Sequence, residues 1–176
     1  HRICLDGDWL VFPVSPGQDL SPDNLVPNKV YRVPASTHLQ PALYPENPYW
    51  GTHIRAINDF EWIYSRSFRV PAEHPARRVR LRFEGVDYYA SVWVNGQMLG
   101  DHEGHFASFE FDVTNQVRRG AENTLLVRVT APWDKPVPGA YSPADRVLRG
   151  MVKGLYEHSE GLIPPDVNPI GIWRPV

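Results

Sequence analysis

Hydrophobic and polar residues alternate with a period of two along several short stretches of this chain. In RVRLRFEG, Val79, Leu81 and Phe83 would face one side while the intervening arginines face the other. Such alternation is typical of a β-strand with one buried face. The same pattern predicts strands within residues 61–71, 88–99, 106–113 and 123–130.

Turn residues separate these stretches. Asn95 and Gly96 suit the two positive φ angles of a type I′ hairpin turn. No window of 11 or more residues repeats apolar positions at helical spacing, and 18 prolines and 13 glycines divide the chain. In DVTNQVRRGAEN we expect one short helical turn, with Asp112 or Thr114 accepting from free N–H groups and Gly120 ending it. The sequence therefore predicts an all-β sandwich or jelly roll.

Two long proline-rich segments, residues 13–53 and 132–170, interrupt the strand pattern. Loops of such length are usually functional or disordered. Their aromatic residues argue against disorder, because disordered segments are poor in them. These aromatics include Tyr44, Tyr49, Trp50, Trp133, Tyr141 and Tyr156. These loops are therefore the expected location of functional side chains.

Composition limits the class of protein. A chain of 176 residues, 42% hydrophobic and 22% charged, predicts a single domain spanning residues 1–176. The formal charge of −2 gives no electrostatic case for nucleic acid or a membrane surface. Cys4 has no disulfide partner within the chain, and no run approaches the roughly 20 apolar residues of a membrane helix. We expect a soluble chain of undetermined compartment. Its start at His1, without a methionine, favours a processed chain or a piece of a larger protein.

Four stretches together resemble the N-terminal sugar-binding domain of glycoside hydrolase family 2, which contains β-galactosidases, β-glucuronidases and β-mannosidases. They are LDGDWLVFP, FEWIYSRSFRVP, RVRLRFEGVDYYASVWVNGQMLGDHEGHFASFEFDVTNQVRRGAENTLLVRV and GIWRPV. The resemblance covers nearly the whole chain. It implies a galactose-binding-domain-like jelly roll, followed in the parent protein by immunoglobulin-like and TIM-barrel domains.

The resemblance also implies that catalysis belongs to the parent enzyme, a retaining β-glycosidase without a cofactor. Its two catalytic glutamates would lie in the barrel, so this chain alone should be inactive. Acids within the chain could be mistaken for that pair, but no spacing marks two of them as opposed. They are Glu84, Glu103, Glu110, Glu157 and Glu160, of which Glu110 is expected on a solvated strand face.

His102 and His105 raise the alternative of a metal site. Residues three apart share a helix face, but on a strand they face opposite sides, and no motif supplies a third ligand. We therefore predict no metal. The resemblance implies instead that the nearby glycines let the chain cross between strands, while Phe106 and Phe109 fill the core.

The resemblance implies that a side chain just before the exit-strand glycine holds a sugar hydroxyl. PPDVNPIGIWRPV offers Asp166 and Asn168 there, and carboxylates or amides suit sugar hydroxyls. The spacing from Asp166 to Gly171 is one residue shorter than the family pattern, and the Trp-Asp-Trp of β-mannosidases is missing from YEHSEGLIPP. The alternative is that Asp166 only caps a turn between prolines.

The loop YPENPYWG is the second candidate. Family members often carry an asparagine-containing loop here, so Asn47 and Glu46 could hydrogen-bond a sugar while Trp50 stacks on it. The alternative is that these aromatics form the loop's own small core.

The favoured hypothesis is a non-catalytic domain that helps to shape the sugar pocket and braces the barrel of an enzyme hydrolysing O-glycosidic bonds in carbohydrate metabolism. The expected partners are a β-glycoside, bound with the remainder of the parent enzyme, and the downstream domains. Two alternatives stay open: a stand-alone carbohydrate-binding module and a purely structural interdomain scaffold. The sugar and its linkage are not specified.

Overall fold

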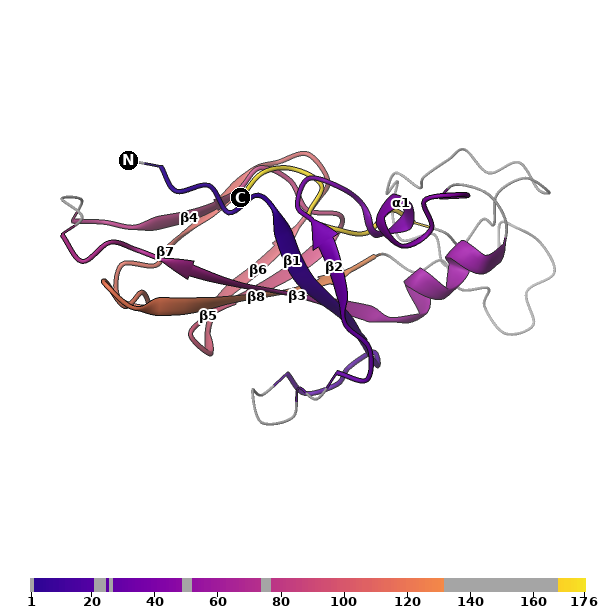
Figure 1. Cartoon of the computed structure of the whole chain (residues 1–176), viewed down its shortest axis with the longest axis horizontal. Helices are drawn as coiled ribbons and strands as arrows, with labels where there is room; N and C mark the ends of the chain where they lie inside the picture. The colour runs from indigo at the N-terminus through magenta and orange to yellow at the C-terminus, as the bar shows by residue number, and fades with distance from the viewer. Residues whose placement is uncertain (1, 21–24, 26, 49–51, 74–76, 132–167) are drawn as a thin grey trace.

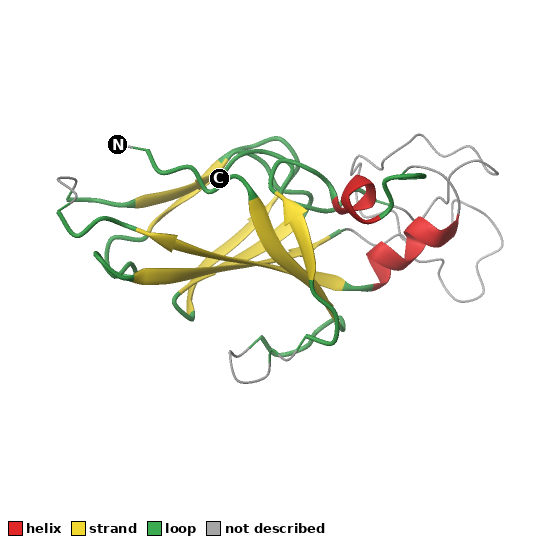
Figure 2. Cartoon of the chain, in the orientation of Figure 1, coloured by secondary structure: helices red, strands yellow, loops and turns green. Residues whose placement is uncertain are grey.

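Short strands dominate the structure, with two short helices near one end (Figures 1 and 2). The computed structural model describes residues 2–20, 25, 27–48, 52–73, 77–131 and 168–176. The strands in these ranges are β1 (Asp8–Val14), β2 (Tyr31–Pro34), β3 (Glu61–Arg69), β4 (Arg80–Phe83), β5 (Tyr89–Val94), β6 (Gln97–Glu103), β7 (Phe109–Asp112) and β8 (Glu122–Thr130). The helices are α1 (Leu39–Leu43) and the 3₁₀ helix η2 (Thr52–Asp59). The predicted all-β class is confirmed.

Two antiparallel sheets make the sandwich. The larger sheet has the strand order β2-β1-β3-β8-β5-β6, and the smaller sheet pairs β4 with β7. Strands β3 and β5 begin beside Thr130 at the end of β8 and run back toward Glu122 at its start. We call the end near Thr130 the loop end and the end near Glu122 the hairpin end. Both helices lie at the loop end, because η2 leads directly into β3 (Figure 1).

The predicted alternation places the core between the sheets. In β4, Leu81 and Phe83 are buried whereas Arg80 and Arg82 are exposed. Phe83 stacks on Phe109 of β7 with ring centroids 4.8 Å apart. Fully burying a side chain of this kind contributes roughly 1.5–3 kcal/mol. The largest fully buried side chains are Trp9, Tyr64 and Phe83.

The predicted hairpin turn is also confirmed, because Asn95 and Gly96 have φ angles of 51° and 80°. In DVTNQVRRGAEN the chain makes one hydrogen-bonded turn without an assigned helix. Asp112 accepts from the Thr114 N–H at 3.0 Å, which caps the turn as expected. A hydrogen bond from the Thr114 hydroxyl, together with the one from its N–H, lowers the pKa of Asp112. Gly120, with φ of 73°, follows the turn.

The proline-rich segment at residues 13–53, predicted to be a long loop, contains regular secondary structure, namely β2, α1 and the start of η2. Pro41 lies in the first turn of α1, where the missing N–H costs nothing. Helix η2 buries Ile54 and Ile57, which are three residues apart as 3₁₀ geometry requires. Both helices are shorter than the 11 residues over which a helical repeat of apolar positions can be recognised. Residues 132–167 lie outside the described ranges.

Candidate functional site at the loop end

Three amide residues from distant parts of the chain meet at the loop end. The carbonyl oxygen of Asn168 accepts from Gln40 Nε2 at 2.7 Å and from Asn58 Nδ2 at 3.1 Å. Asn58 Oδ1 accepts from the Asn168 N–H at 3.0 Å. We call Gln40, Asn58 and Asn168 the loop-end amide cluster. It fixes the backbone of Asn168 against α1 and η2.

The loop-end amide cluster is buried, and one of its acceptors has no partner among the described residues. Gln40 is 0% exposed, and Asn168 and Asn58 are also buried. The Oε1 atom of Gln40 is buried without a hydrogen-bond partner among the described residues. An unpaired buried acceptor costs about 1–3 kcal/mol. The cluster therefore holds an acceptor that the described part of the domain does not use.

Between α1 and η2, Glu46 and Asn47 are both exposed. The carbonyl oxygen of Asn47 accepts from His53 Nε2 at 3.1 Å, and the Tyr44 ring packs edge-on against His53 with centroids 5.0 Å apart. The loop backbone is therefore held by η2, while the carboxylate of Glu46 and the amide of Asn47 stay accessible.

A buried carboxylate ties the exit segment to the sandwich. Asp87, 4% exposed, accepts from His38 Nε2 at 2.7 Å and from His105 Nδ1 at 2.5 Å. Its backbone exchanges two hydrogen bonds with Gly171, each of 2.9 Å. Trp173 stacks on His38 with centroids 5.7 Å apart and donates to the His105 carbonyl oxygen at 3.0 Å. We call His38, Asp87, His105 and Trp173 the Asp87 clamp.

The clamp needs only one ring hydrogen on each histidine. His38 carries it on Nε2 and His105 on Nδ1, so the carboxylate accepts from both. The Nε2 atom of His105 is buried with no hydrogen-bond partner among the described residues. The arrangement orients side chains, since both carboxylate oxygens of Asp87 are engaged by histidines. Its effect is to fix residues 170–173 just after Asn168.

A family model described as glycosyl hydrolase 2 galactose-binding domain-like matches residues 20–149. The chain belongs to glycoside hydrolase family 2. A β-galactosidase of Thermoanaerobacter pseudethanolicus is 34% identical over 109 residues, covering 60% of this chain and 14% of the relative. A probable β-mannosidase of Caenorhabditis elegans is 28% identical over 168 residues, covering 95% and 17%. The chain thus spans less than a fifth of these family 2 relatives.

Solved family 2 structures share the fold. The β-glucuronidase of Lactobacillus rhamnosus matches with a TM-score of 0.60 and 25% identity, over 76% of this chain and 22% of that one. A Bifidobacterium dentium β-glucuronidase complexed with coumarin-3-O-glucuronide matches with a TM-score of 0.57 and 30% identity, over 72% and 20%. The predicted family and its galactose-binding-like sandwich are confirmed. No helix in the described part of the chain is long and apolar enough to cross a membrane.

The structure describes three of the five predicted sugar-binding residues of this family 2 domain. Glu46 and Asn47 lie in the loop between α1 and η2, and Asn168 is bonded to side chains from both helices. For Asn168, the structure shows hydrogen bonds that anchor its backbone. Trp50 and Asp166 lie outside the described residues. Sugar contact by these five residues stays a prediction.

The two histidines of DHEGHF have separate surroundings. His102 stacks on Phe109 with centroids 3.9 Å apart, and burial lowers its pKa, against the opposing effect of Glu103. His105 belongs to the Asp87 clamp. Among the described residues, no group of three or more His, Cys, Asp or Glu side chains is placed to hold a metal. Phe109 packs in the core as predicted, but the prediction for Phe106 was wrong, because it is 56% exposed beyond the turn at Gly104.

The described glutamates that could be mistaken for a catalytic pair are occupied in local contacts. Glu84 pairs with Arg82, and Glu110 pairs with Arg80 on the exposed strand face predicted for it. Glu103 accepts from the Tyr88 hydroxyl at 2.9 Å. Glu157 and Glu160 lie outside the described ranges.

The Asp87 clamp could not be predicted from sequence spacing. His38 lies 49 residues before Asp87 and His105 lies 18 residues after it, so no local spacing joins them. A local signal for a functional residue is Asp87 itself, an acid that directly follows the apolar Val86 where the central family motif begins a strand.

Proposed function

We propose that this chain is the non-catalytic N-terminal domain of a family 2 β-glycosidase, and that its loop end forms one wall of the sugar pocket. Exposed Glu46 and Asn47, with Asp166 and Asn168, would hydrogen-bond hydroxyls away from the bond being cleaved, and Trp50 would stack on the sugar. The remainder of the parent enzyme would supply the catalytic carboxylates. The sandwich would brace that catalytic part.

One observation supports this proposal above the others. The loop-end amide cluster joins Asn168 to Gln40 and Asn58 across 128 and 110 residues, so the two segments predicted to bind sugar are held beside the same pair of helices. A rigid support of this kind suits hydrogen bonding to a sugar, since directional contacts require fixed positions.

The test uses the parent enzyme and aryl β-galactoside, β-glucuronide and β-mannoside substrates. Replacing Asn47 by Ala removes one hydrogen bond to a hydroxyl, worth about 0.5–1.5 kcal/mol, so kcat/KM should fall about 2- to 10-fold on the preferred substrate. Asn115→Ala is the matched control, because Asn115 is an exposed asparagine in the turn near the hairpin end. It should leave kcat/KM unchanged.

The outcome also separates the alternatives. If both Asn47→Ala and Asp166→Ala leave kcat/KM intact, the domain is a structural scaffold and the proposal fails. If the isolated chain binds oligosaccharides tightly in titration calorimetry, the carbohydrate-binding module is favoured. Substrate turnover by the pure isolated chain would contradict its non-catalytic role.

A further inference from the structure

A pocket of about 500 Å³ lies on the outer face of the larger sheet. Alternate residues of β5 are buried in the core, so Trp93 projects from the opposite face of that strand. The pocket is lined by Trp93, by Gln18 and Leu20 of the loop after β1, and by Leu126 and Arg128 of β8. An aromatic ring with a few polar groups, in a pocket of roughly 300–1,000 Å³, is the usual composition of a small-molecule site.

Trp93 differs from the other tryptophans in the described ranges. Trp9, Trp62 and Trp173 each donate the indole N–H to a backbone carbonyl oxygen, at 3.0, 2.7 and 3.0 Å. Within the part of the chain that the structure describes, the indole N–H of Trp93 has no partner, and its ring makes no ring–ring or cation–π contact. The side chain is only half-buried. Trp93 therefore presents both an apolar ring face and an unused donor to the pocket.

Both walls of the pocket are held in place. In the loop after β1, the Gly17 N–H donates to Glu61 Oε1 at 3.2 Å, and Leu20 packs on buried side chains of β1 and β3. On the sheet, Glu61 also forms an ion pair with Arg128 at 2.9 Å. Only the Oε1 atom of the Gln18 side chain has a partner among the described residues, so its amino group is available as a donor. The pocket therefore offers donors at fixed positions before any ligand binds.

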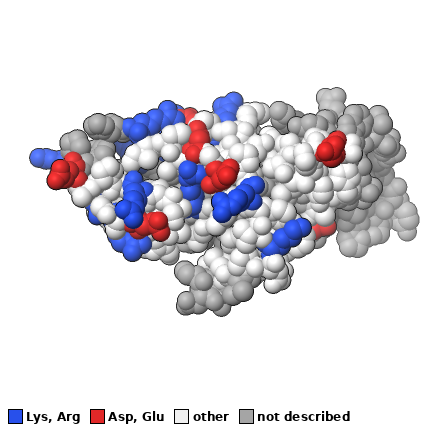
Figure 3. Space-filling model, viewed as in Figure 1, with Lys and Arg blue, Asp and Glu red and all other residues white. Residues whose placement is uncertain are grey.

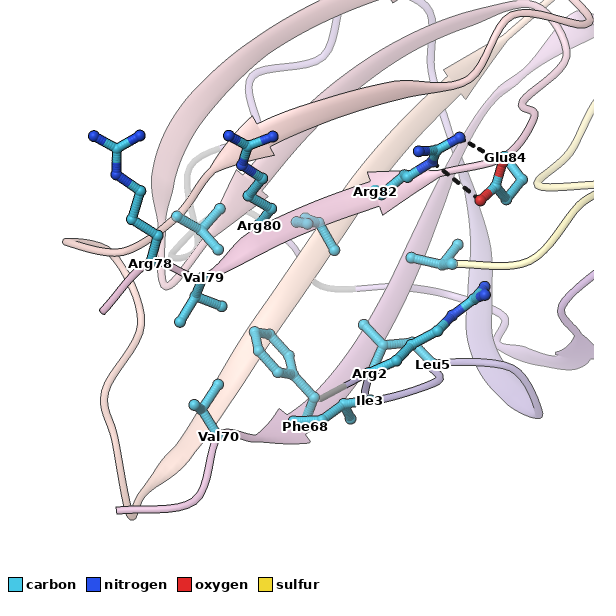
Figure 4. A pocket seen from close by; sticks show the side chains of 13 residues that line it. Arg2, Ile3, Leu5, Phe68, Val70, Arg78, Val79, Arg80, Arg82 and Glu84 are labelled. Carbon is cyan, nitrogen blue, oxygen red and sulfur yellow. Dashed lines mark hydrogen bonds and ion pairs between the residues drawn. The ribbon is translucent and has the colours of Figure 1, made fainter. Parts of the chain in front are cut away.

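Charge in the pocket is balanced. Glu61 neutralises Arg128, and the remaining charged residue of the lining is Asp19. On the molecular face shown in Figure 3, cationic and anionic side chains are likewise interspersed. The surface beside β4 is different, because several arginines line it together and it contains no tryptophan (Figure 4). An anionic ligand would therefore gain no net electrostatic attraction in the Trp93 pocket.

We propose that this pocket binds a neutral sugar, with one pyranose ring stacked on Trp93. The apolar C–H face of a sugar packs on an indole ring while its hydroxyls stay in polar surroundings. Because hydroxyls both donate and accept, they can pair with the indole N–H, the Gln18 amide and the Arg128 guanidinium together. A purely apolar ligand would cover these donors without pairing them. The pocket contains none of the loop-end residues, so the inference does not depend on the proposed function.

The experiment is an NMR titration of the 176-residue chain with β-1,4-linked tetrasaccharides of glucose, mannose, galactose and xylose. The indole N–H signal of Trp93, assigned by its absence in Trp93→Phe, should shift saturably with at least one of them, at a Kd of roughly 1 mM. Trp93→Ala should weaken this binding about tenfold or more, because it removes the stacking face. Gln18→Ala removes one hydrogen bond and should weaken it about 2- to 10-fold.

Met98→Ala is the matched control. Met98 is the cross-strand neighbour of Trp93 and is 53% exposed, but it does not line the pocket. Its replacement should leave the Kd unchanged. The backbone amide spectrum of each variant shows whether it folds like the parent. Since Gln18 lies in a loop outside the core, Gln18→Ala tests the pocket even if Trp93→Ala does not fold.

Each other outcome overturns the proposal. Absence of a saturable Trp93 shift with all of these sugars would mean that the pocket is not a sugar site. Equal weakening by Trp93→Ala and Met98→Ala would mean non-specific apolar contact, and tighter binding of a β-1,4-linked tetraglucuronate would contradict a neutral ligand. Shifts of the Asn47 amide without a Trp93 shift would place the sugar at the loop end. That last result would support the proposed function and defeat only this inference.

Discussion

Buried amide side chains cluster at both ends of the sandwich, but the two clusters are paired differently. At the hairpin end, Asn123 is fully buried and uses all of its hydrogen-bonding capacity. Its Oδ1 accepts from Asn95 Nδ2 and the Arg118 N–H, and its Nδ2 donates to the carbonyl oxygens of Arg118 and Ala121. These partners lie 2 to 28 residues away along the chain.

The loop-end amide cluster joins residues 110 and 128 positions apart, and its Gln40 Oε1 has no partner within the described part of the chain. The two clusters therefore use amide hydrogen bonds in different ways. At the hairpin end, the saturated Asn123 stabilises a turn through local hydrogen bonds, although the Oε1 atom of nearby Gln116 is also buried without a partner among the described residues. An unsaturated cluster between remote segments gives up stability but keeps polar capacity at the end proposed to meet sugar.

The largest effect should come from Gly171, which joins the loop end to the Asp87 clamp. Its φ is +145°, and an added Cβ would lie 2.9 Å from Tyr64 Oη and 3.0 Å from the Thr37 carbonyl oxygen. Gly171→Ala combines backbone strain with contacts inside a buried site, so we expect a loss of about 3–5 kcal/mol in the free energy of unfolding. Urea denaturation measures it.

Gly17→Ala is the matched control. Gly17 also has a positive φ, +76°, but an added Cβ would meet nothing within 4 Å. Only the conformational cost of about 1–2 kcal/mol should remain. Similar losses for the two variants would show that close packing at Gly171 does not hold the loop end.

The next-largest effect is the difference in the free energy of unfolding between variants of the two amide clusters. Asn123→Leu leaves the N–H and C=O of Arg118 and the C=O of Ala121 without a partner, so it should cost about 2–3 kcal/mol. Gln40→Met removes one bond to Asn168, whose carbonyl oxygen keeps Asn58, and also removes the unpaired acceptor. That variant should stay within about 1 kcal/mol of the parent.

Thermal and urea unfolding of both variants would measure their destabilisation. Equal destabilisation would mean that the loop-end cluster is as structural as the hairpin-end cluster, and the contrast between them would disappear.

Much of the sandwich could be predicted from local pattern. Period-two alternation located β3, β4, β5, β7 and β8, and Asn95-Gly96 located the hairpin, because strand faces and turn angles depend on neighbouring residues. Helices α1 and η2 could not be found this way. They span 5 and 8 residues, too few for a helical repeat to emerge.

The candidate site was less predictable, because it is built from long-range contacts. Nothing near Asp87 in the sequence indicates His38, and nothing near Asn168 indicates Gln40. Phe106 was assigned to the core by resemblance. It is exposed because Gly104, with φ of 135°, ends the alternation before that residue is reached.

The smallest expected effect concerns the pH dependence of stability, to which a partly buried histidine contributes. His102 lies outside the clamp, and burial lowers its pKa below 6.5 despite Glu103. The unfolded chain therefore binds this proton more readily than the folded chain does. The stability that His102 contributes is complete above about pH 6.5 and is lost as the pH falls toward the lower folded value.

Replacing His102 removes this titration. His102→Phe keeps a ring against Phe109 and His102→Gln does not, so the two variants should differ in absolute stability. Both should nevertheless show a shallower loss of the free energy of unfolding between pH 7.5 and 5.0 than the parent. Urea midpoints at the two pH values measure the slope. An unchanged slope in both variants would show that His102 does not contribute to the pH dependence of this domain's stability.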